Sequence, residues 1–245
     1  MAEAIDQARD NPTDQTTDQT TDRPTREPMD EPMDQAMESA NAKALWRQRL
    51  RPLRLDWARQ VQAEILAVAR RDLLGPLPPG QSLGLYWPLA GEIDLRGLAE
   101  RPADCPAAAQ GERLALPAVA GVPGQGHLEY RSWQPGAPLA PDLCRIPAPL
   151  GPALAPEQLG LLLVPALGCD RQGIRLGYGG GWYDRLRADP AWRGVPALAV
   201  LPAACLVEQL PRDPWDVPFA GWLDETGVHL LPAGGSCPWG AGRPT

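Results

Sequence analysis

Four glycines fall within five residues past the middle of the chain, in the stretch GYGGG at positions 177–181. An apolar run at residues 161–167 precedes them, and its length and composition are typical of a strand buried on both faces. Glycine lets the backbone turn through positive φ and approach a ligand closely. A Gly-rich loop between a strand and a helix can therefore present its N–H groups to a phosphate.

Two charged residues flank this loop. Arg175 stands two residues before the first glycine, and a guanidinium matches phosphate oxygens in both charge and geometry. Asp184 follows the aromatic pair Trp182 and Tyr183, and its carboxylate is the kind of ligand that Mg²⁺ takes beside a nucleotide. The spacing fits neither a Walker A loop nor the dinucleotide fingerprint, in which Trp182 would be a glycine. Taken alone, such a loop is more often an ordinary turn than a nucleotide site.

Short apolar segments alternate with helical ones along the rest of the chain. We expect strands at residues 83–87, 113–119, 128–133, 195–201 and 226–231, and helices over residues 37–74, from residue 93, and from residue 182 to about 190. This alternation is typical of a three-layer α/β/α sandwich with a mainly parallel, Rossmann-like sheet. Glu92 stands where a strand end meets a helix start, the edge on which such proteins place their sites. A carboxylate there is also favoured by the helix dipole, so the position by itself does not establish a function.

The long first helix carries the only lysine of the chain, Lys43, among 22 arginines. Lys43 and Arg47 are four residues apart and so share one face near the start of this helix. A break of the helix at Pro52 is an open alternative. The ordinary interpretation of the arginines at 47, 49, 51, 54 and 59 is a charged outer face.

Charge is unevenly distributed. The chain has 245 residues and a net charge of −7; of its 30 acidic and 23 basic residues, 11 and 3 lie in residues 1–40, which leaves 19 and 20 for the rest. We expect a disordered acidic extension over residues 1–40, a single α/β domain over residues 41–231 and a flexible tail over residues 232–245. A nearly neutral body excludes a basic nucleic-acid surface, and no apolar run is long enough to span a membrane. A monomer is expected.

The five cysteines are dispersed, without a CxxC pair, and the chain has only two histidines. No zinc site can be assembled at the usual spacing. An odd number of scattered cysteines without a signal peptide predicts free thiols and a cytoplasmic location. Cys169 has no histidine near it in sequence, and we expect it to take no part in chemistry.

The fuller motif is more specific than the loop alone. Residues 164–184 read VPALGCDRQGIRLGYGGGWYD, which resembles the signature of the 5-formyltetrahydrofolate cyclo-ligase family, also called methenyltetrahydrofolate synthetases. The resemblance extends over about residues 43–224. It implies ATP-dependent cyclisation of 5-formyltetrahydrofolate to 5,10-methenyltetrahydrofolate, with folate and ATP as the partners and Mg²⁺ as the metal. It also implies the α/β sheet expected above, of the kind found in sugar-phosphate isomerases and coenzyme A transferases.

The resemblance assigns roles to residues that match the family pattern. It implies that Lys43 and Arg175 are catalytic, that Glu92 and, less strongly, Trp87 bind the folate, and that Asp184 and, less certainly, Asp216 hold Mg²⁺. Trp182 and Tyr183 are expected to line the pocket between the two ligands. The ATP-binding residues that it implies are Lys43, Arg47, Arg175, Gly177, Tyr178, Gly179, Gly180, Gly181, Trp182 and Tyr183.

Four positions depart from the family pattern: Ala148, Trp182, Cys205 and Trp215 stand where the family usually has Glu, Tyr, Gln and His. One alternative is therefore a non-catalytic relative that binds a nucleotide or folate. The retained charged residues argue against it, because buried charge without a ligand is costly and should be lost first. A weaker alternative is a sugar-phosphate isomerase or an acyl-transfer enzyme on a related sheet.

Overall fold

A computed structural model describes residues 31–73, 77–100 and 113–232 of the chain. The expected acidic extension falls mostly on residues 1–30 and the expected tail on residues 233–245, and both segments lie outside the described residues. None of the helices within the described ranges combines the length and the apolar character that a membrane crossing requires.

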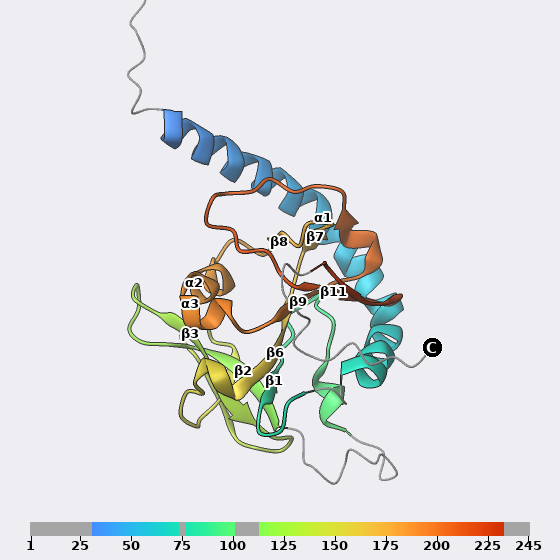
Figure 1. Cartoon of the computed structure of the whole chain (residues 1–245), viewed down its shortest axis with the longest axis vertical. Helices are drawn as coiled ribbons and strands as arrows, with labels where there is room; N and C mark the ends of the chain where they lie inside the picture. Colours follow the sequence, from blue (N-terminus) through green and yellow to red (C-terminus); the bar gives the residue numbers. More distant parts are fainter. Residues whose placement is uncertain (1–30, 74–76, 101–112, 233–245) are drawn as a thin grey trace, which may run out of the picture.

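A seven-stranded sheet forms the centre of the molecule, in the order β12-β11-β9-β6-β1-β2-β3 (Figure 1). The five inner strands are parallel, whereas β3 and β12 pair antiparallel at the two edges. The strands are β1 (Ser82–Gly84), β2 (Arg113–Ala120), β3 (His127–Trp133), β6 (Leu159–Pro165), β9 (Ala197–Val200), β11 (Gly221–Asp224) and β12 (Gly227–Leu230). The mainly parallel sheet expected from the sequence is confirmed.

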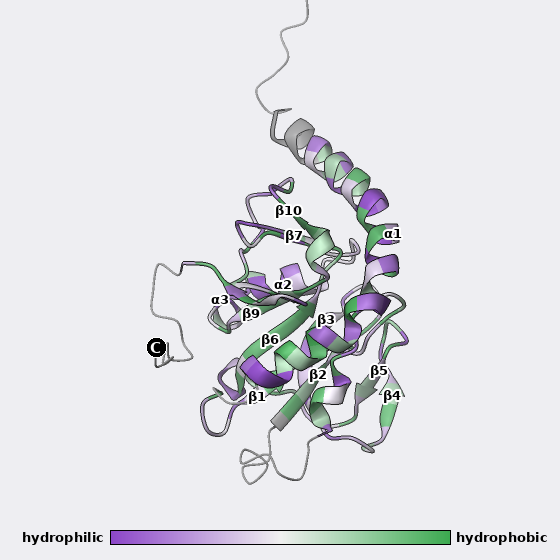
Figure 2. Ribbon diagram, turned by 90° about the vertical axis from the view of Figure 1, so that its right-hand side faces the viewer, coloured by the Kyte–Doolittle hydropathy of each residue, from purple (hydrophilic) through white to green (hydrophobic). Residues whose placement is uncertain are grey.

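The central strand β6 separates two hydrophobic clusters. Leu161 and Leu163 belong to a cluster with the second half of helix α1 (Glu31–Leu73), and Leu162 and Val164 belong to a cluster that includes helix α2 (Trp182–Ala188). Successive side chains of a strand point to opposite faces, so one apolar run packs on both helices. Figure 2 shows this as a continuous hydrophobic colour along β6 between the helical layers. The three-layer arrangement is confirmed.

Helix α1 differs from the expectation at its start, and the alternative of a break at Pro52 is set aside. It begins at Glu31, so the expected domain boundary at residue 40 falls inside it, and it continues through Pro52 without a break. Its second half packs on the sheet, while its first half extends past the sheet beside the loops (Figure 1). Arg54 is 4% exposed, so the expectation that it lies on a charged outer face was wrong.

Several short elements were not expected. Two-residue and three-residue strands are too short to carry a periodic signal. They form a sheet in the order β10-β7-β8 and a separate pair, β4 with β5. A 3₁₀ turn, η1 (Arg96–Ala99), replaces the helix expected from residue 93. The remaining elements are β4 (Leu139–Pro141), β5 (Pro147–Pro149), β7 (Gly168–Asp170), β8 (Arg175–Leu176), β10 (Leu206–Val207), α3 (Pro190–Arg193), η3 (Pro156–Gln158) and η4 (Ala203–Cys205).

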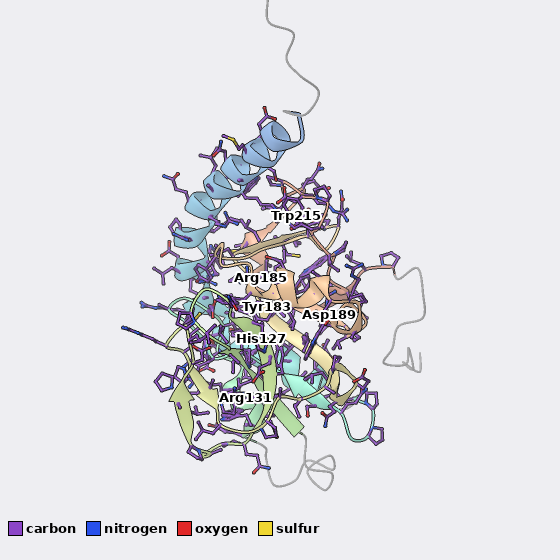
Figure 3. The ribbon with its side chains drawn as sticks, turned by 90° about the vertical axis from the view of Figure 1, so that its left-hand side faces the viewer. His127, Arg131, Tyr183, Arg185, Asp189 and Trp215 are labelled. Carbon is purple, nitrogen blue, oxygen red and sulfur yellow. The ribbon has the colours of Figure 1, made fainter. Side chains whose placement is uncertain are left out.

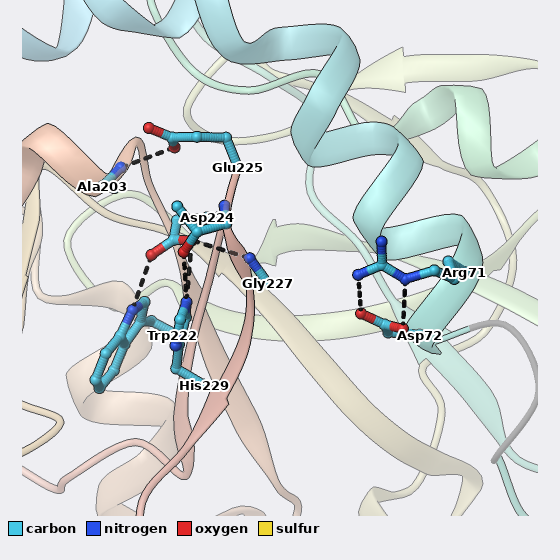
Figure 4. Close-up of polar contacts among 9 residues, drawn as sticks. Arg71, Asp72, Ala203, Trp222, Asp224, Glu225, Gly227 and His229 are labelled. Carbon is cyan, nitrogen blue, oxygen red and sulfur yellow. Dashed lines mark hydrogen bonds and ion pairs between the residues drawn. The ribbon is translucent and has the colours of Figure 1, made fainter. Parts of the chain in front are cut away.

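A buried carboxylate organises the last hairpin of the sheet. Asp224 is 2% exposed and accepts hydrogen bonds from Trp222 Nε1 (3.1 Å) and from the Thr226 hydroxyl (2.6 Å). The backbone N–H groups of Thr226 (2.8 Å) and Gly227 (3.2 Å) also donate to it, and His229 Nε2 lies 3.1 Å away (Figure 4). Because one side chain satisfies both turn amides and two side chains, it defines the turn between β11 and β12.

Replacing this carboxylate should destabilise the fold. We expect Asp224→Ala to lower the free energy of unfolding by about 2–4 kcal/mol, because several buried donors lose their acceptor together. Urea denaturation followed by circular dichroism measures the change. Asp56→Ala, at an exposed position of α1, is the matched control and should stay within about 0.5 kcal/mol of the unsubstituted protein. Equal stability of the two variants would contradict the role given to Asp224.

Candidate active site

One cavity of about 690 Å³ collects every side chain that the sequence analysis named as a site residue. It lies between the first half of α1, the segment after β1, the Gly-rich loop with the start of α2, and the loop at residues 213–216. Figure 3 labels Trp215 on that last loop and Tyr183 on α2. The sequence-predicted residues that line it are Lys43, Arg47, Trp87, Glu92, Arg175, Gly177, Tyr178, Gly179, Gly180, Gly181, Trp182, Tyr183, Asp184 and Asp216.

The Gly-rich loop is held against α1. The Gly177 carbonyl accepts a hydrogen bond from Arg47 Nε at 2.9 Å, which ties the loop to a residue 130 positions earlier. Gly179 (φ 104°) and Gly181 (φ 65°) adopt positive φ, where a side chain would be strained. Two glycines of the motif are therefore required by the backbone conformation, and α2 begins directly after the second.

Arg175 is a nearly buried cation at the wall of the cavity. Its side chain is 6% exposed, and its Nη1 donates to the Pro165 carbonyl at 3.0 Å. Nη2 lies 3.4 Å from Asp184 Oδ1, and the guanidinium carbon lies 5.3 Å from the centre of the Tyr183 ring. Its Nε has no hydrogen-bond partner among the described residues. A buried cation with incomplete hydrogen bonding is suited to receive an anion.

Lys43 lies between two carboxylates. Its Nζ is 2.7 Å from Asp213 Oδ2 and 2.6 Å from Asp216 Oδ2, and the backbone N–H of Asp213 donates to the same oxygen of Asp216 at 2.8 Å. Burial lowers the pKa of Lys43, but the hydrogen bonds to both carboxylates outweigh it and raise the pKa above its ordinary value. For Asp213 the signs are the opposite: burial raises its pKa, and the hydrogen bond from Lys43 helps to turn this into a net lowering. Lys43 is therefore protonated at neutral pH.

Asp213 was missed in the sequence analysis, although it stands three residues before Asp216. Two acids at that spacing in a Pro-rich loop were the available signal. Within the described ranges, no set of three or more His, Cys, Asp or Glu side chains is placed to hold a metal ion. Asp184, whose side chain is 42% exposed, lines the same cavity.

Glu92 is a buried carboxylate in the lining of the cavity. Its side chain is 3% exposed, its Oε2 accepts a hydrogen bond from the Leu89 N–H at 2.9 Å, and its Oε1 lies 3.6 Å from Arg54 Nη1. Burial raises the pKa of Glu92, and the Leu89 amide and Arg54 offset this only in part. Trp87 also lines the cavity, and the Arg96 guanidinium carbon lies 4.2 Å from the centre of the Trp87 ring.

Arg54 was missed as a site residue because it was grouped with exposed arginines. Its position does carry a signal, since the neighbouring buried residues of α1 follow a helical period. A charged residue within an apolar stripe indicates a buried partner, which here is Glu92. The stripe comprises Leu50, Arg54, Ala58, Val61 and Ile65.

A fifth wall of the cavity comes from the segment between β4 and β5. Asp142 organises it by accepting hydrogen bonds from the N–H groups of Val119 (2.9 Å), Cys144 (2.8 Å) and Ile146 (2.9 Å). These four residues line the cavity, and none was named from the sequence. Their contribution depends on a contact with β2 across 23 positions, which the sequence pattern does not show.

Of the four departures from the family pattern, two are buried and two line the cavity. Ala148 lies in β5 and is 3% exposed, and Cys205 is fully buried, so each is accommodated by packing. Trp215 is 59% exposed and lines the cavity beside Asp213 and Asp216. Trp182, the fourth departure, also lines the cavity, so Trp182 and Trp215 are the two changes that a ligand there would meet.

Comparisons with known proteins agree on one family. The family model described as "5-formyltetrahydrofolate cyclo-ligase family" matches residues 41–222. The 5-formyltetrahydrofolate cyclo-ligase of Escherichia coli K12 is 26% identical over 176 residues, which cover 71% of this chain and 92% of that protein. The enzyme of the same name from Mycolicibacterium smegmatis is 35% identical over 113 residues, covering 44% of this chain and 57% of its own.

Two solved structures resemble the fold. The 5,10-methenyltetrahydrofolate synthetase of Aquifex aeolicus superposes with a TM-score of 0.60 at 26% identity, covering 80% of this chain and 95% of its own. The Mycoplasma pneumoniae enzyme of that name has a TM-score of 0.57 at 19% identity, covering 75% and 98%. The second likeness supports the fold alone.

The cysteines offer a test of how the core beside the cavity is packed. Burial raises the pKa of the Cys169 thiol to about 12, so at pH 8 only about one thiol in ten thousand is ionised. Burial raises the pKa of Cys205 to about 12 as well, whereas Cys144 is exposed. We expect iodoacetamide at pH 8 to label Cys144 and to spare Cys169 and Cys205, as measured by peptide mass mapping. Labelling in urea, where all three should react, is the control, and rapid native labelling of Cys169 would refute its burial.

Proposed function

The chain belongs to the 5-formyltetrahydrofolate cyclo-ligase family, and we propose that the cavity is where it closes 5-formyltetrahydrofolate to 5,10-methenyltetrahydrofolate at the expense of ATP. The observation that carries the assignment of the site is the convergence of the motif residues. Side chains from positions 43 to 216 line one cavity of about 690 Å³, a volume in the range of small-molecule sites. Three cations and a buried carboxylate are among them.

The cations that line the cavity suit the triphosphate. Lys43, Arg47 and Arg175 supply positive charge, and the backbone of residues 177–181 supplies N–H donors. Lys43 is already neutralised by Asp213 and Asp216, so bound phosphate competes with these carboxylates for the ammonium group. This arrangement keeps Lys43 extended toward the site before the nucleotide arrives.

The buried Glu92 carboxylate suits the pterin. A pterin ring presents an amino group and a neighbouring ring N–H on one edge, and an ionised carboxylate can accept both. Glu92 has the needed burial, and Trp87 offers an aromatic face beside it. We assign the pterin to Glu92. We assign the reacting groups to the part of the cavity that Trp182 and Tyr183 line.

Asp184 fits a Mg²⁺ bound with the nucleotide. Mg²⁺ commonly takes only one or two carboxylates when substrate phosphates and water provide the other ligands, so a larger acidic cluster is not needed. The half-exposed Asp184 carboxylate lies in the cavity wall next to Arg175, where the phosphates are placed. Asp216 is a second candidate, although Lys43 and the Asp213 N–H both contact its Oδ2. The metal would neutralise phosphate charge during transfer.

The chemistry asks the protein mainly for placement. In the first step the γ-phosphoryl group passes from ATP to the formyl oxygen, and ADP is released. In the second step N10 attacks the formyl carbon and loses its proton. The C–O bond then breaks, and its electron pair leaves on phosphate. The first step turns a poor leaving group into a good one. The second is intramolecular, so holding the substrate in the reactive conformation supplies much of the rate. Lys43 and Arg175 would stabilise the transferring phosphoryl group.

The second candidate, a non-catalytic relative that binds folate or nucleotide, rests on the changed positions. Two of these are buried away from the cavity wall, and the charged residues that line the cavity are all present. This favours turnover. The family assignment sets aside the isomerase or acyl-transfer alternative. The monomeric state and the cytoplasmic location stay predictions.

Turnover can be tested by absorbance. The protein is mixed with 5-formyltetrahydrofolate and Mg²⁺, ATP is added, and the near-ultraviolet band of the methenyl product is followed. We expect an ATP-dependent rise, and a loss of about 10²-fold or more in kcat/KM for ATP in Lys43→Met and Asp184→Asn. Arg171→Met, at an exposed position, is the control and should keep full activity. A flat trace from protein that still binds both ligands by calorimetry would favour the non-catalytic relative.

A second substitution distinguishes the proposed folate contact from the proposed ATP contacts. Glu92→Gln should raise the KM for 5-formyltetrahydrofolate by about 10–100-fold, because charge-assisted hydrogen bonds to the pterin are lost, and should change the KM for ATP less than about threefold. Glu64→Gln, on the exposed face of α1, is the control. Equal increases in both constants would argue against a folate-specific role for Glu92.

A further inference from the structure

Arg54 is a buried charge that the proposed reaction does not use. Its side chain is 5% exposed, and it lies beneath the cavity wall instead of lining it. Burying a guanidinium is costly unless it is paired and hydrogen-bonded. The residue must therefore be explained by what it touches.

Three groups surround the Arg54 guanidinium. Nη1 lies 3.6 Å from Glu92 Oε1, Nη2 lies 3.4 Å from the Ala90 carbonyl, and the guanidinium carbon lies 4.8 Å from the centre of the Tyr178 ring. Its Nε has no hydrogen-bond partner among the described residues. One buried cation thus contacts two segments of the cavity wall. These are the segment after β1, which carries the proposed folate residue Glu92, and the Gly-rich loop, which carries the proposed phosphate donors.

We propose that Arg54 is a positioning residue for the folate: it holds the Glu92 carboxylate in its charged form and in a fixed orientation, and it acts through Glu92 without touching the substrate. The proposal rests on the proposed function, because it needs Glu92 to be the pterin anchor. Tyr178 and the Ala90 carbonyl fix the guanidinium from its other sides.

The electrostatic surroundings of Glu92 make Arg54 the principal source of positive charge. Arg54 faces it from α1, Arg175 from β8, Tyr86 from the segment after β1 and Tyr183 from α2. Burial raises the pKa of both tyrosines, and the Tyr86 hydroxyl donates to the Ile93 carbonyl at 2.6 Å, so both phenols are neutral. Within the described part of the chain, Arg175 forms no hydrogen bond or ion pair with Glu92, and it lowers the pKa of Glu92 less than Arg54 does.

The sign of the expected pH effect follows from this. The pKa of Glu92 already lies above its ordinary value because of burial, and Arg54 opposes that rise. Removing the guanidinium raises the pKa further, so the carboxylate becomes protonated at higher pH than before. A protonated carboxyl offers one acceptor fewer to the pterin edge. Folate binding should therefore fail at higher pH in the variant than in the unsubstituted protein.

The test compares five proteins: unsubstituted, Arg54→Met, Arg54→Lys, Glu92→Gln and Arg59→Met, the last being a matched control at an exposed position of the same helix. Calorimetry measures the Kd of 5-formyltetrahydrofolate without ATP between pH 5.5 and 8.5, and steady-state assays give both KM values. For Arg54→Met we expect folate binding about tenfold weaker or worse at pH 7, an acid limit of binding moved to higher pH, and a smaller change in the KM for ATP. Arg54→Lys should restore part of the affinity, and Arg59→Met should match the unsubstituted protein.

The outcomes separate this inference from the proposed function. Absence of folate binding by the unsubstituted protein overturns the proposed function, and this inference with it. Binding by the unsubstituted protein with an unchanged Kd and acid limit in folded Arg54→Met overturns the role of Arg54 alone. If Arg54→Met does not fold, Arg54→Lys carries the test, since it keeps the charge but loses the planar fork. A Kd in Arg54→Lys weakened severalfold supports the proposal, and an unchanged Kd overturns it.

Discussion

Burial of β6 on both faces is the constraint on which the rest of the structure depends. A strand with apolar side chains on each side can be covered only by two layers, so α1 and α2 are drawn to opposite faces of the sheet. The chain then leaves β6 at its carboxyl end through the buried strand β7 and returns by β8 to the Gly-rich loop. The Gly-rich loop lies there because α2, which follows it directly, must return to the sheet. The position of the candidate active site is thus a consequence of how β6 is packed.

The first half of α1 completes the cavity from a distance. It extends past the sheet, where Arg47 contacts the Gly177 carbonyl and Lys43 contacts the loop that carries Asp213 and Asp216. A helix is stiff over this length, so packing its second half on the sheet also sets the place of the first. Continuity through Pro52 matters for the same reason, because a break there would uncouple the cations from the core.

The cations in and beneath the candidate site are held by different partners. Lys43 is neutralised by two carboxylates, which bound phosphate would replace in the proposed complex. Arg175 is fixed by the Pro165 carbonyl and lies beside Asp184, and its Nε has no hydrogen-bond partner among the described residues. Arg54 is paired with Glu92 below the surface. Removing one member of such a buried pair costs about 3–5 kcal/mol, so Glu92 and Arg54 are constrained as a unit.

The sequence by itself determined the residues whose spacing is local. The glycines, Arg175, Asp184 and the pair Lys43 and Arg47 lie within short motifs, and the alternation of apolar segments predicted the mainly parallel sheet. Only the tertiary structure showed that Asp213 pairs with Lys43 across 170 positions, that Asp142 forms a wall by contact with β2, and that Arg54 is buried against Glu92. These contacts join segments far apart in the chain, and whether a charged side chain is solvated or buried depends on what packs over it. The helical period of α1 places Arg54 in an apolar stripe, but it does not show which groups pack over the side chain; these are Glu92, the Ala90 carbonyl and the Tyr178 ring.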